Sequence, residues 1–360
     1  MAEPLLRVED LRTYFHSSRG MVRAVDGVGF ALDKGKTLAI VGESGCGKSM
    51  TALSILQLVP EPAGYIESGR ILYRGRDLLD YTVEEMRAIR GKEIAMIFQE
   101  PMTSLNPVFT VSMQIIEAMA VHDYARGKAA RSRAMELLDL VNLPNPAQVL
   151  RSYPFELSGG MRQRVMIAMA LACDPDLLIA DEPTTALDVT VQAQILELIA
   201  GLQERLGMAV LLITHDLGIV AEMADDVAVM YAGQIVESAP TRELFRDPKH
   251  PYTQGLFASL PHRRHRGQEL AVLEGTVPDP AAWPPGCRFE PRCPKRFEPC
   301  RAILPAWAEP RSRHIVACHL YPPGVTEPDE PVSGSAAAAP LAAEPVRAGQ
   351  VSAAGQEAKP

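Results

Sequence analysis

The sequence predicts an α/β fold built around a parallel sheet. Three short apolar runs are typical of buried strands: Thr37–Val41, Leu177–Ala180 and Ala209–Ile213. The segment Val189–Arg205, between the second and third runs, has helical periodicity. Strands that are apolar along their whole length and alternate with helices are typical of parallel sheets covered on both faces.

Four further patterns predict the elements around this sheet. Leu5–Leu32 alternates apolar and polar residues and is broken at Ser17–Gly20, which predicts antiparallel strands joined by a turn. Ser49–Val59 has helical periodicity, and residues from about 82 to 150 are predicted to be mostly helical. Two segments, Val227–Tyr231 and Gln234–Ser238, flank Ala232 and Gly233 and predict a hairpin.

Composition narrows the class of protein. The chain has 360 residues, is 47% hydrophobic and carries a formal net charge of -8. This is enough apolar material for one large or two smaller domains, and the acidic balance argues against a nucleic-acid partner. No apolar run is long enough to span a bilayer, and the first residues do not resemble a secretory signal peptide. We expect a cytosolic protein that reaches a membrane only through a partner.

A phosphate-binding loop is predicted directly after the first apolar strand. The eight residues from Gly42 to Ser49 match the pattern G-x-x-x-x-G-K-[ST], and a strand precedes them while a helix follows. We expect backbone N–H groups to surround the phosphates, Lys48 to reach the β- and γ-phosphates, and Ser49 to bind Mg²⁺. The predicted ATP-binding residues are Gly42, Glu43, Ser44, Gly45, Cys46, Gly47, Lys48, Ser49 and Met50. Cys46 stands at a variable position and is expected to contribute only its backbone.

Acidic residues end the second apolar strand, and a histidine follows the third. Asp181 and Glu182 come directly after Leu177–Ala180, and His215 follows Ile213 and Thr214. Catalytic groups of open α/β sheets lie at such strand ends. Asp181 is a candidate for holding Mg²⁺, Glu182 for general base and His215 for contact with the γ-phosphate. Alone, Asp181 and Glu182 would be read as an acidic cap and His215 as structural.

A third motif lies between the phosphate loop and the acidic pair. Leu157, Ser158, Gly159, Gly160 and Met161 begin a segment that resembles the signature of ATP-binding-cassette (ABC) ATPases, with Met161 where Gln is common. Ser158 and the two glycines offer a hydroxyl and closely approaching N–H groups at a helix start. The resemblance implies a P-loop core with an antiparallel β subdomain and a helical subdomain. It also implies that one subunit's signature faces the ATP held by another.

Other positions resemble the family's remaining site residues. Phe15, with Tyr14 as the alternative, resembles the aromatic residue that stacks on adenine, and ordinary strand packing is equally compatible with it. Gln99 resembles the glutamine that contacts Mg²⁺ and links to the helical subdomain. The loop of Ala186, Leu187 and Asp188 resembles the one that crosses the dimer interface.

Two longer segments resemble the oligopeptide and dipeptide importers within this family. They are Phe98–Pro107 and His250–Leu256, and the region from Gly286 to Leu320 resembles the C-terminal extension of the same group. The resemblance implies a peripheral subunit at the cytoplasmic face of a membrane that couples ATP hydrolysis to peptide uptake. Its implied partners are two permeases, a second ATPase subunit and an extracytoplasmic solute-binding protein. Nickel importers share much of this pattern and remain the alternative.

The resemblance also implies a division of the chain. We expect an ATPase domain over residues 5–245, with a helical subdomain at about 100–170, and a C-terminal extension over 246–321. Residues 322–360 are rich in Ala, Pro, Gly and Glu, which predicts a disordered tail. A soluble ABC ATPase of DNA repair or translation is disfavoured because no second cassette or coiled-coil insertion is visible.

Four cysteines in the extension form a candidate metal site. Cys287, Cys293, Cys300 and Cys318 follow the spacing C-x5-C-x6-C-x17-C. The spacing lacks the C-x2-C pairs of a zinc ribbon, and a late cluster in a reducing compartment is more typical of metal binding than of disulfides. The resemblance implies a [4Fe–4S] cluster, with Zn²⁺ or ordinary free thiols as alternatives.

Overall fold

The computed structural model describes residues 3–99, 104–185, 187–259 and 273–326. These residues belong to one compact unit, Met1–Thr326. Ala186, part of the segment Phe98–Pro107 and the predicted tail from residue 327 onward lie outside the described residues. Within the described part of the chain, no helix combines the length and apolar character needed to cross a membrane.

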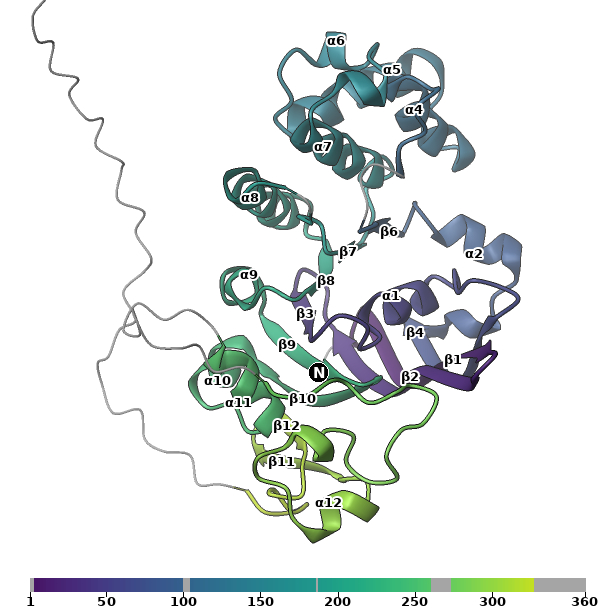
Figure 1. Cartoon of the computed structure of the whole chain (residues 1–360). Coiled ribbons are helices and arrows are strands. Elements are labelled where there is room, and N and C mark those ends of the chain that lie inside the picture. Colours follow the sequence, from purple (N-terminus) through teal and green to yellow (C-terminus); the bar gives the residue numbers. More distant parts are fainter. Residues whose placement is uncertain (1–2, 100–103, 186, 260–272, 327–360) are drawn as a thin grey trace, which may run out of the picture. The chain divides into compact units, whose positions relative to one another are not determined.

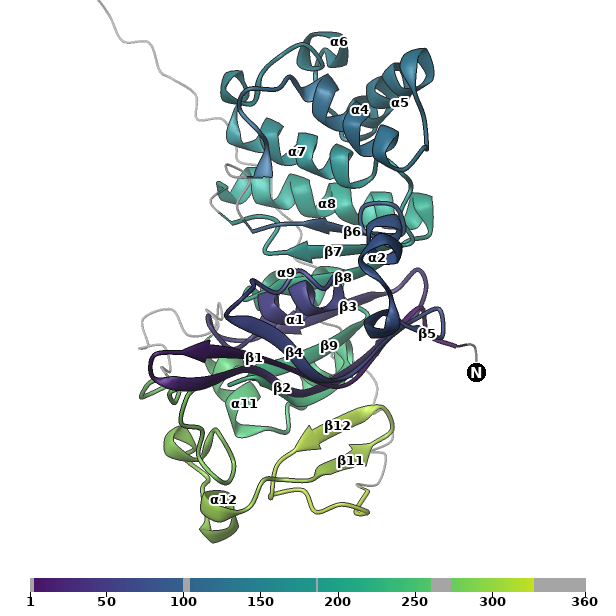
Figure 2. The same ribbon diagram turned by 90° about the vertical axis from the view of Figure 1, so that its right-hand side faces the viewer.

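The strands are the framework of this unit (Figures 1 and 2). They are β1 (Leu6–Ser17), β2 (Gly20–Leu32), β3 (Thr37–Val41), β4 (Gly64–Tyr73), β5 (Arg76–Asp77), β6 (Ile94–Ile97), β7 (Leu177–Asp181), β8 (Ala209–Thr214), β9 (Asp226–Tyr231), β10 (Gln234–Pro240), β11 (Trp307–Arg311) and β12 (His314–Ala317). The helical segments pack around them. They are α1 (Lys48–Ile55), α2 (Val83–Ile89), α4 (Val111–Val121), α5 (Gly127–Leu140), α6 (Pro146–Val149), α7 (Gly159–Ala170), α8 (Val189–Leu206), α9 (Leu217–Met223), α10 (Thr241–Arg246), α11 (Pro251–Ala258) and α12 (Glu298–Ala302), with 3-10 turns at Leu78–Asp80, Pro154–Glu156 and Glu290–Arg292.

The main sheet has the strand order β11-β12-β10-β9-β3-β8-β7-β6. Strands β9, β3, β8, β7 and β6 run parallel, whereas β10, β12 and β11 continue the sheet by antiparallel pairing. The three predicted apolar strands are β3, β7 and β8, and the predicted hairpin is β9–β10. A second, antiparallel sheet with the order β2-β1-β4-β5 contains the predicted N-terminal strand pair.

The stretch from 82 to 150 is mostly helical, as predicted, but one strand in it is not predicted from the sequence. The stretch from 82 to 150 contains the strand β6 as well as helices, and β6 pairs with β7 in parallel register from Ile94 opposite Leu177 to Ile97 opposite Ala180. Ile94 and Ile97 are buried, so this short segment gains more from the sheet than from a helix. The strand matters for the site because Gln99 follows directly after it.

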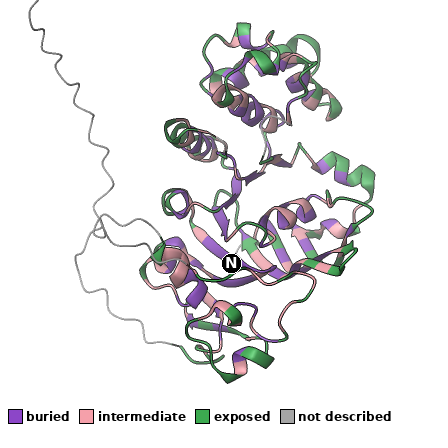
Figure 3. Cartoon of the chain, in the orientation of Figure 1, coloured by how far each residue is buried: buried purple, intermediate pink, exposed green. Residues whose placement is uncertain are grey.

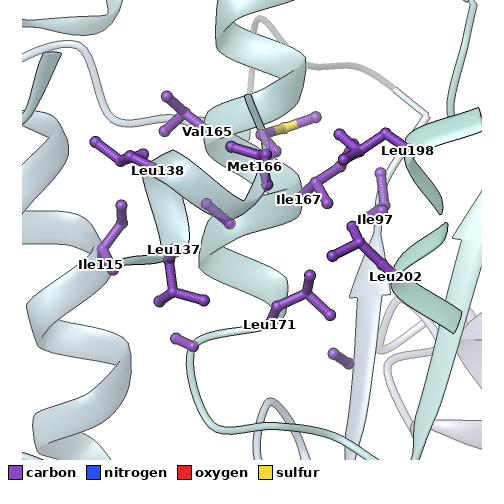
Figure 4. Packing of buried hydrophobic residues seen from close by; sticks show 14 of the residues in the cluster. Ile97, Ile115, Leu137, Leu138, Val165, Met166, Ile167, Leu171, Leu198 and Leu202 are labelled. Atoms are coloured by element: carbon purple, nitrogen blue, oxygen red, sulfur yellow. The ribbon is translucent and has the colours of Figure 1, made fainter. Parts of the chain in front are cut away.

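The helices α4, α5 and α7 gather into a group that packs on one end of the main sheet (Figure 2). Their buried side chains form one hydrophobic core with residues of β6, β7, β8 and α8. In the view of Figure 4, Met166 and Ile167 of α7 lie between Ile115 and Leu138 on one side and Ile97, Leu198 and Leu202 on the other. Because one continuous core joins the helices to the sheet, the segments at the two ends of α7 are held relative to the strand ends.

The C-terminal region is built into the same sheet. Strand β12 pairs with β10, from Glu237 opposite Val316 to Ser238 opposite Ile315, and β11 pairs with β12. Tyr231, Tyr252 and Phe289 are all fully buried and pack with their ring centroids 4.6–5.5 Å apart. Figure 3 shows buried positions running through β9 and β10. The extension therefore shares its core with the main sheet.

Candidate functional site

The parallel strands place the predicted site residues at one edge of the main sheet. The phosphate loop follows β3, Gln99 follows β6, Asp181 and Glu182 follow β7, and His215 follows β8. These strands are neighbours in the order β3-β8-β7-β6. Carboxyl ends of parallel strands meet at the same edge of a sheet, which is where open α/β folds bind ligands.

Close backbone packing shapes the phosphate loop. A Cβ atom on Gly42 would lie 2.1 Å from the carbonyl oxygen of Met230, and one on Gly47 would lie 2.3 Å from that of Ala24. Both positions therefore require glycine. Helix α1 begins at Lys48, so the loop ends at a helix N-terminus that favours anions.

Lys48 points back over the loop. Its Nζ donates to the carbonyl oxygens of Gly42 at 2.8 Å and Glu43 at 3.1 Å. The side chain of Cys46 is buried, and burial raises the pKa of its thiol. A neutral buried thiol is a poor ligand, which agrees with the expectation that Cys46 acts through its backbone. Ser44 and Gly45 are exposed, and Met50 is half-buried.

Ser49 and Asp181 meet between the loop and β7. The Ser49 hydroxyl donates to Asp181 Oδ1 at 3.1 Å, and the Asp181 side chain is buried. Burial raises the pKa of Asp181, while the hydrogen bond from Ser49 opposes that rise. Hard oxygen donors of this kind suit Mg²⁺, so Ser49 and Asp181 fit the predicted metal-binding pair.

Glu182 is the residue on which the other side chains converge. Its Oε2 accepts from Gln99 Nε2 at 3.1 Å and from the Thr185 hydroxyl at 2.9 Å, and its Oε1 lies 3.3 Å from His215 Nδ1. Its backbone is in the left-handed region, with φ of 46°. Burial works to raise the pKa of Glu182, but the hydrogen bonds from Thr185 and His215 outweigh it and lower the pKa. The carboxylate is therefore ionised at neutral pH.

Three features of this cluster differ from the sequence expectation or add to it. Gln99 donates to Glu182, whereas the sequence predicts that it binds Mg²⁺ with Ser49 and Asp181. Thr185 was not singled out, although a hydroxyl three residues after the acidic pair was a signal for it. His215 remains 63% exposed, so its outer face is open to a ligand.

The signature residues start helix α7. Ser158 is the N-cap, and its hydroxyl accepts from the N–H of Met161 at 3.4 Å. Leu157 is buried, whereas Gly159 and Gly160 lie beside Leu187 and Val191. The helix begins at Gly159 and leaves the glycine N–H groups at its N-terminus.

Leu187 and Asp188 precede helix α8. The Asp188 carboxylate is the N-cap and accepts from the N–H of Val191 at 3.0 Å. Ala186, the third predicted residue of this loop, lies outside the described residues. The loop after β7 thus leads to Leu187 and Val191, which contact the signature glycines.

Tyr14 and Phe15 have different surroundings. Tyr14 is buried and donates to Asp26 Oδ1 at 2.8 Å, so its ring and its hydroxyl are both used within the fold. Phe15 is half-buried beside Gly64, where a Cβ atom would lie 2.4 Å from its ring. Phe15 therefore has the more available aromatic face of the two candidates.

The four cysteines of the extension line one small cavity with a volume of about 10 Å³. All six cysteines of the chain are free thiols. Burial raises the pKa of Cys287 to about 11 and that of Cys318 to about 12, so both are neutral at pH 7. The set of four soft sulfur donors fits an iron–sulfur cluster or Zn²⁺. Their present spacing does not, because no three Cys, His, Asp or Glu side chains among the described residues are arranged around a common metal position.

Together, the parallel core, the phosphate loop, the acidic pair and the separate antiparallel and helical parts define an ABC-type ATPase. The family described as ABC transporter matches residues 25–185, and the family described as oligopeptide/dipeptide transporter, C-terminal region, matches residues 236–300. The dimeric structure of MJ0796, a bacterial ABC transporter cassette, superimposes with a TM-score of 0.59 at 26% identity and covers 66% of this chain and 99% of that one. CbiO1 of Clostridium perfringens gives a TM-score of 0.58 at 28% identity, with 68% of this chain and 92% of that one covered.

Curated relatives narrow the class further. The oligopeptide transport ATP-binding protein AppD of Bacillus subtilis is 52% identical, with 88% of this chain and 97% of that protein covered. The dipeptide transport ATP-binding protein DppD of the same organism is 51% identical over 88% of this chain and 95% of its own length. This chain therefore belongs to the oligopeptide/dipeptide family of ABC transporter ATP-binding proteins, the ATPase subunits of peptide importers.

Proposed function

We propose that this chain hydrolyses ATP at the edge of its main sheet and that this reaction drives the uptake of dipeptides or oligopeptides. The observation that carries the proposal is the convergence of Gln99, Thr185 and His215 on the ionised Glu182, next to the Ser49–Asp181 pair. A phosphate loop alone indicates nucleotide binding. A fixed carboxylate base beside it adds the means to cleave the nucleotide.

Each side chain has a distinct role in the proposed reaction. Lys48 leaves the loop carbonyls and binds the β- and γ-phosphates of ATP. Glu182 accepts a proton from water while the water oxygen attacks the γ-phosphorus and the bond to the β–γ bridging oxygen breaks, so ATP and water yield ADP and phosphate. His215 contacts the γ-phosphate and helps to place the water. Each carboxylate oxygen has two lone pairs, so Glu182 can accept a proton from water beside its contacts with Gln99, Thr185 and His215.

Mg²⁺ would be held by Ser49, Asp181 and Gln99. When bound, it neutralises charge on the phosphates. The nucleotide base would stack on Phe15. Burial raises the pKa of Asp181, whereas the hydrogen bond from Ser49 favours the charged carboxylate that Mg²⁺ binding requires.

The signature would complete the site of another subunit. Ser158, Gly159 and Gly160 form a helix start that offers a hydroxyl and free N–H groups to an anion. We infer that this start faces the γ-phosphate of ATP held by a second ATPase subunit, so that two nucleotides are enclosed between two subunits. The loop of Leu187 and Asp188 lies beside the signature and would follow the same interface.

Replacing the proposed base tests the reaction directly. Glu182→Gln is expected to bind ATP like the wild type but to lower kcat by about 100-fold or more, because a general base typically contributes that much. The same variant should accumulate as a nucleotide-bound dimer. ATP affinity, steady-state phosphate release and size-exclusion chromatography measure the three quantities. Glu222→Gln, an exposed glutamate of α9, is the matched control. Hydrolysis by Glu182→Gln at the wild-type rate would refute the assignment.

The helical part offers a surface for the permeases. A groove of about 370 Å³ is lined by Phe109, Ser112, Met113, Ile116 and Glu117. Phe109 and Met113 are 40% and 52% exposed, although side chains of this size are usually buried in a monomer. We place a permease segment in this groove, since it lies in the helical part that follows Gln99.

The remaining partners follow from the peptide-importer role. They are two transmembrane permeases, a second ATPase subunit that is related or identical, and an extracytoplasmic solute-binding protein, with this chain on the cytoplasmic face of the membrane. The net charge of -8 disfavours nucleic acid. Recovery of permeases with the tagged chain from solubilised membranes, and loss of peptide uptake in the Glu182→Gln strain, would support the role. Loss of nickel uptake with intact peptide uptake would assign the alternative substrate.

We also propose that Cys287, Cys293, Cys300 and Cys318 hold a metal centre, a [4Fe–4S] cluster or alternatively Zn²⁺. The support is their position around one cavity and the softness of four thiolate donors. Binding would deprotonate the thiols and require them to move closer together than they are here. Anaerobic purification followed by iron, sulfide and zinc analysis tests this, with the Cys300→Ser variant as comparison. A colourless wild-type protein with neither iron nor zinc would refute the proposal.

A further inference from the structure

Every polar group of Glu43, the second residue of the phosphate loop, forms a hydrogen bond within the protein. Its N–H donates to the hydroxyl of Tyr252 at 3.0 Å, and its carbonyl oxygen accepts from Lys48 Nζ at 3.1 Å. Its carboxylate oxygens accept hydrogen bonds from both terminal nitrogens of Arg292, at 2.7 Å and 2.9 Å. Two of these three anchors, Tyr252 and Arg292, come from the C-terminal extension.

Arg292 is itself fixed before it reaches the loop. Its Nε donates to the carbonyl oxygen of Glu274 at 3.1 Å, and Nη2 also donates to that of Leu273 at 3.3 Å. The guanidinium lies 5.8 Å from the ring centroid of Tyr231, and its side chain is only 5% exposed. A planar, bidentate pair whose guanidinium is buried is far more constrained than an ordinary surface ion pair.

The charge of Glu43 makes this contact relevant to ATP. The Glu43 carboxylate belongs to the loop that surrounds the phosphates, and a triphosphate carries several negative charges. An uncompensated carboxylate there would repel the ligand, and a partly buried position screens such repulsion poorly. Arg292 cancels that charge and turns the carboxylate away toward the extension.

Resting on the proposed ATP site, we propose that Arg292 is a positioning residue for ATP binding: it neutralises Glu43 of the phosphate loop and holds the loop from behind, with Tyr252 fixing the backbone of the same residue. The extension thereby sets the affinity of the nucleotide site without touching the nucleotide. This role is separate from the proposed metal centre, because it uses the Arg292 side chain and not the thiols.

The test uses the full chain and measures the equilibrium Kd for Mg·ATP and for Mg·ADP. Arg292→Gln leaves the Glu43 carboxylate unpaired, and we expect the Kd for ATP to rise about tenfold, with a smaller rise for ADP and a smaller effect at high salt. Glu43→Gln leaves an unpaired cation near the phosphates and should lower the Kd. The double variant should return to within about threefold of the wild type. Arg292→Lys keeps the charge but loses the bidentate contact, so its Kd should lie between those of the wild type and Arg292→Gln.

The opposite signs of the two single variants distinguish this role from a merely structural one. If both variants lower the thermal unfolding temperature but leave the Kd unchanged, or if both raise the Kd and the double variant does not recover, the proposal is wrong. Arg296→Gln, at an exposed position of the same segment, is the control and should change neither quantity. Should Arg292→Gln not fold, Glu43→Gln and Arg292→Lys still give the answer. Lys48→Ala keeps the two proposals apart: if it binds ATP undiminished, the proposed site itself has failed, whatever Arg292 does.

Discussion

Several residues shape the site through their backbone conformation as well as through their side chains. Gly42 and Gly47 allow the loop to pass within contact distance of Met230 and Ala24. Glu182 takes a left-handed conformation just after β7, and its N–H donates to the carbonyl oxygen of Ile213 at 2.9 Å. That hydrogen bond fixes the base to the neighbouring strand β8, so its carboxylate is placed before any ligand arrives.

Two glycines of the phosphate loop provide a matched pair for testing these backbone requirements. Gly42→Ala would place a methyl group 2.1 Å from a backbone oxygen of β9, so the loop must shift and ATP binding should be lost. Gly45→Ala meets no atom within 4 Å and should cost only about 1–2 kcal/mol for its φ of 78°. Isothermal titration with ATP and thermal unfolding measure both effects. Equal loss of ATP binding in the two variants would show that conformational strain matters more than the contact.

The residues that the sequence could identify are those held by local patterns. The loop from Gly42 to Ser49, the acidic pair and His215 each follow an apolar strand, so a short window reveals them. The bond between Arg292 and Glu43 spans 249 residues, and no local pattern records it. Thr185 lies between these cases, because its hydroxyl is close in sequence to Glu182 but becomes meaningful only when the turn after β7 is known.

Among the helices and strands, those with a strong apolar pattern could be predicted from the sequence. Strands β3, β7 and β8 are buried along their whole length and were predicted. Strand β6 has four residues and lies in a stretch with mostly helical character, so its membership of the sheet depends on pairing with β7. Strands β11 and β12 are only partly buried and depend on β10, so their apolar pattern is weak. At β6, β11 and β12, pairing with neighbouring strands outweighed the local conformational preference of the sequence.

The N-terminus of α8 gives a test at this scale. Asp188 caps the helix, and Asp188→Ala should lower the free energy of unfolding by about 1 kcal/mol because the N–H of Val191 loses its acceptor. Asp188→Asn should retain most of the stability, since an amide oxygen also caps. Urea unfolding measures both, with Asp139→Ala at an exposed position of α5 as control. A loss in Asp188→Asn as large as in Asp188→Ala would mean that charge, not the cap, stabilises this end.

For the compact unit as a whole, the extension is part of the ATPase core. Arg288 pairs with Asp26 and donates to the carbonyl oxygen of Ala232 at 2.5 Å, which ties the extension to β2 and to the β9–β10 turn. Nη2 of Arg313 donates to both carboxylate oxygens of Asp226, at 2.8 Å and 2.9 Å. Trp283 donates to the carbonyl oxygen of Arg23 at 3.3 Å. The next residue, Ala24, packs against Gly47 of the phosphate loop. Several independent contacts therefore join the extension to the parts that surround the phosphate loop.

Two truncations compare this integrated extension with the tail. Ending the chain after Asp247 removes Tyr252, Phe289 and β12, so it uncovers buried Tyr231 and leaves β10 as an open edge. We expect this form to aggregate, because an unpaired edge beside an exposed apolar surface promotes association. Ending the chain after Thr326 keeps every described contact, and we expect it to unfold at the wild-type temperature and to hydrolyse ATP at the wild-type rate. Soluble yield, calorimetry and phosphate release compare the forms.

A truncation after Asp247 that remained monomeric and unfolded cooperatively at the wild-type temperature would show that β3, β8 and β9 are stable without the extension. The loop position of Glu43 would then have to be set by Gly42 and Lys48 alone.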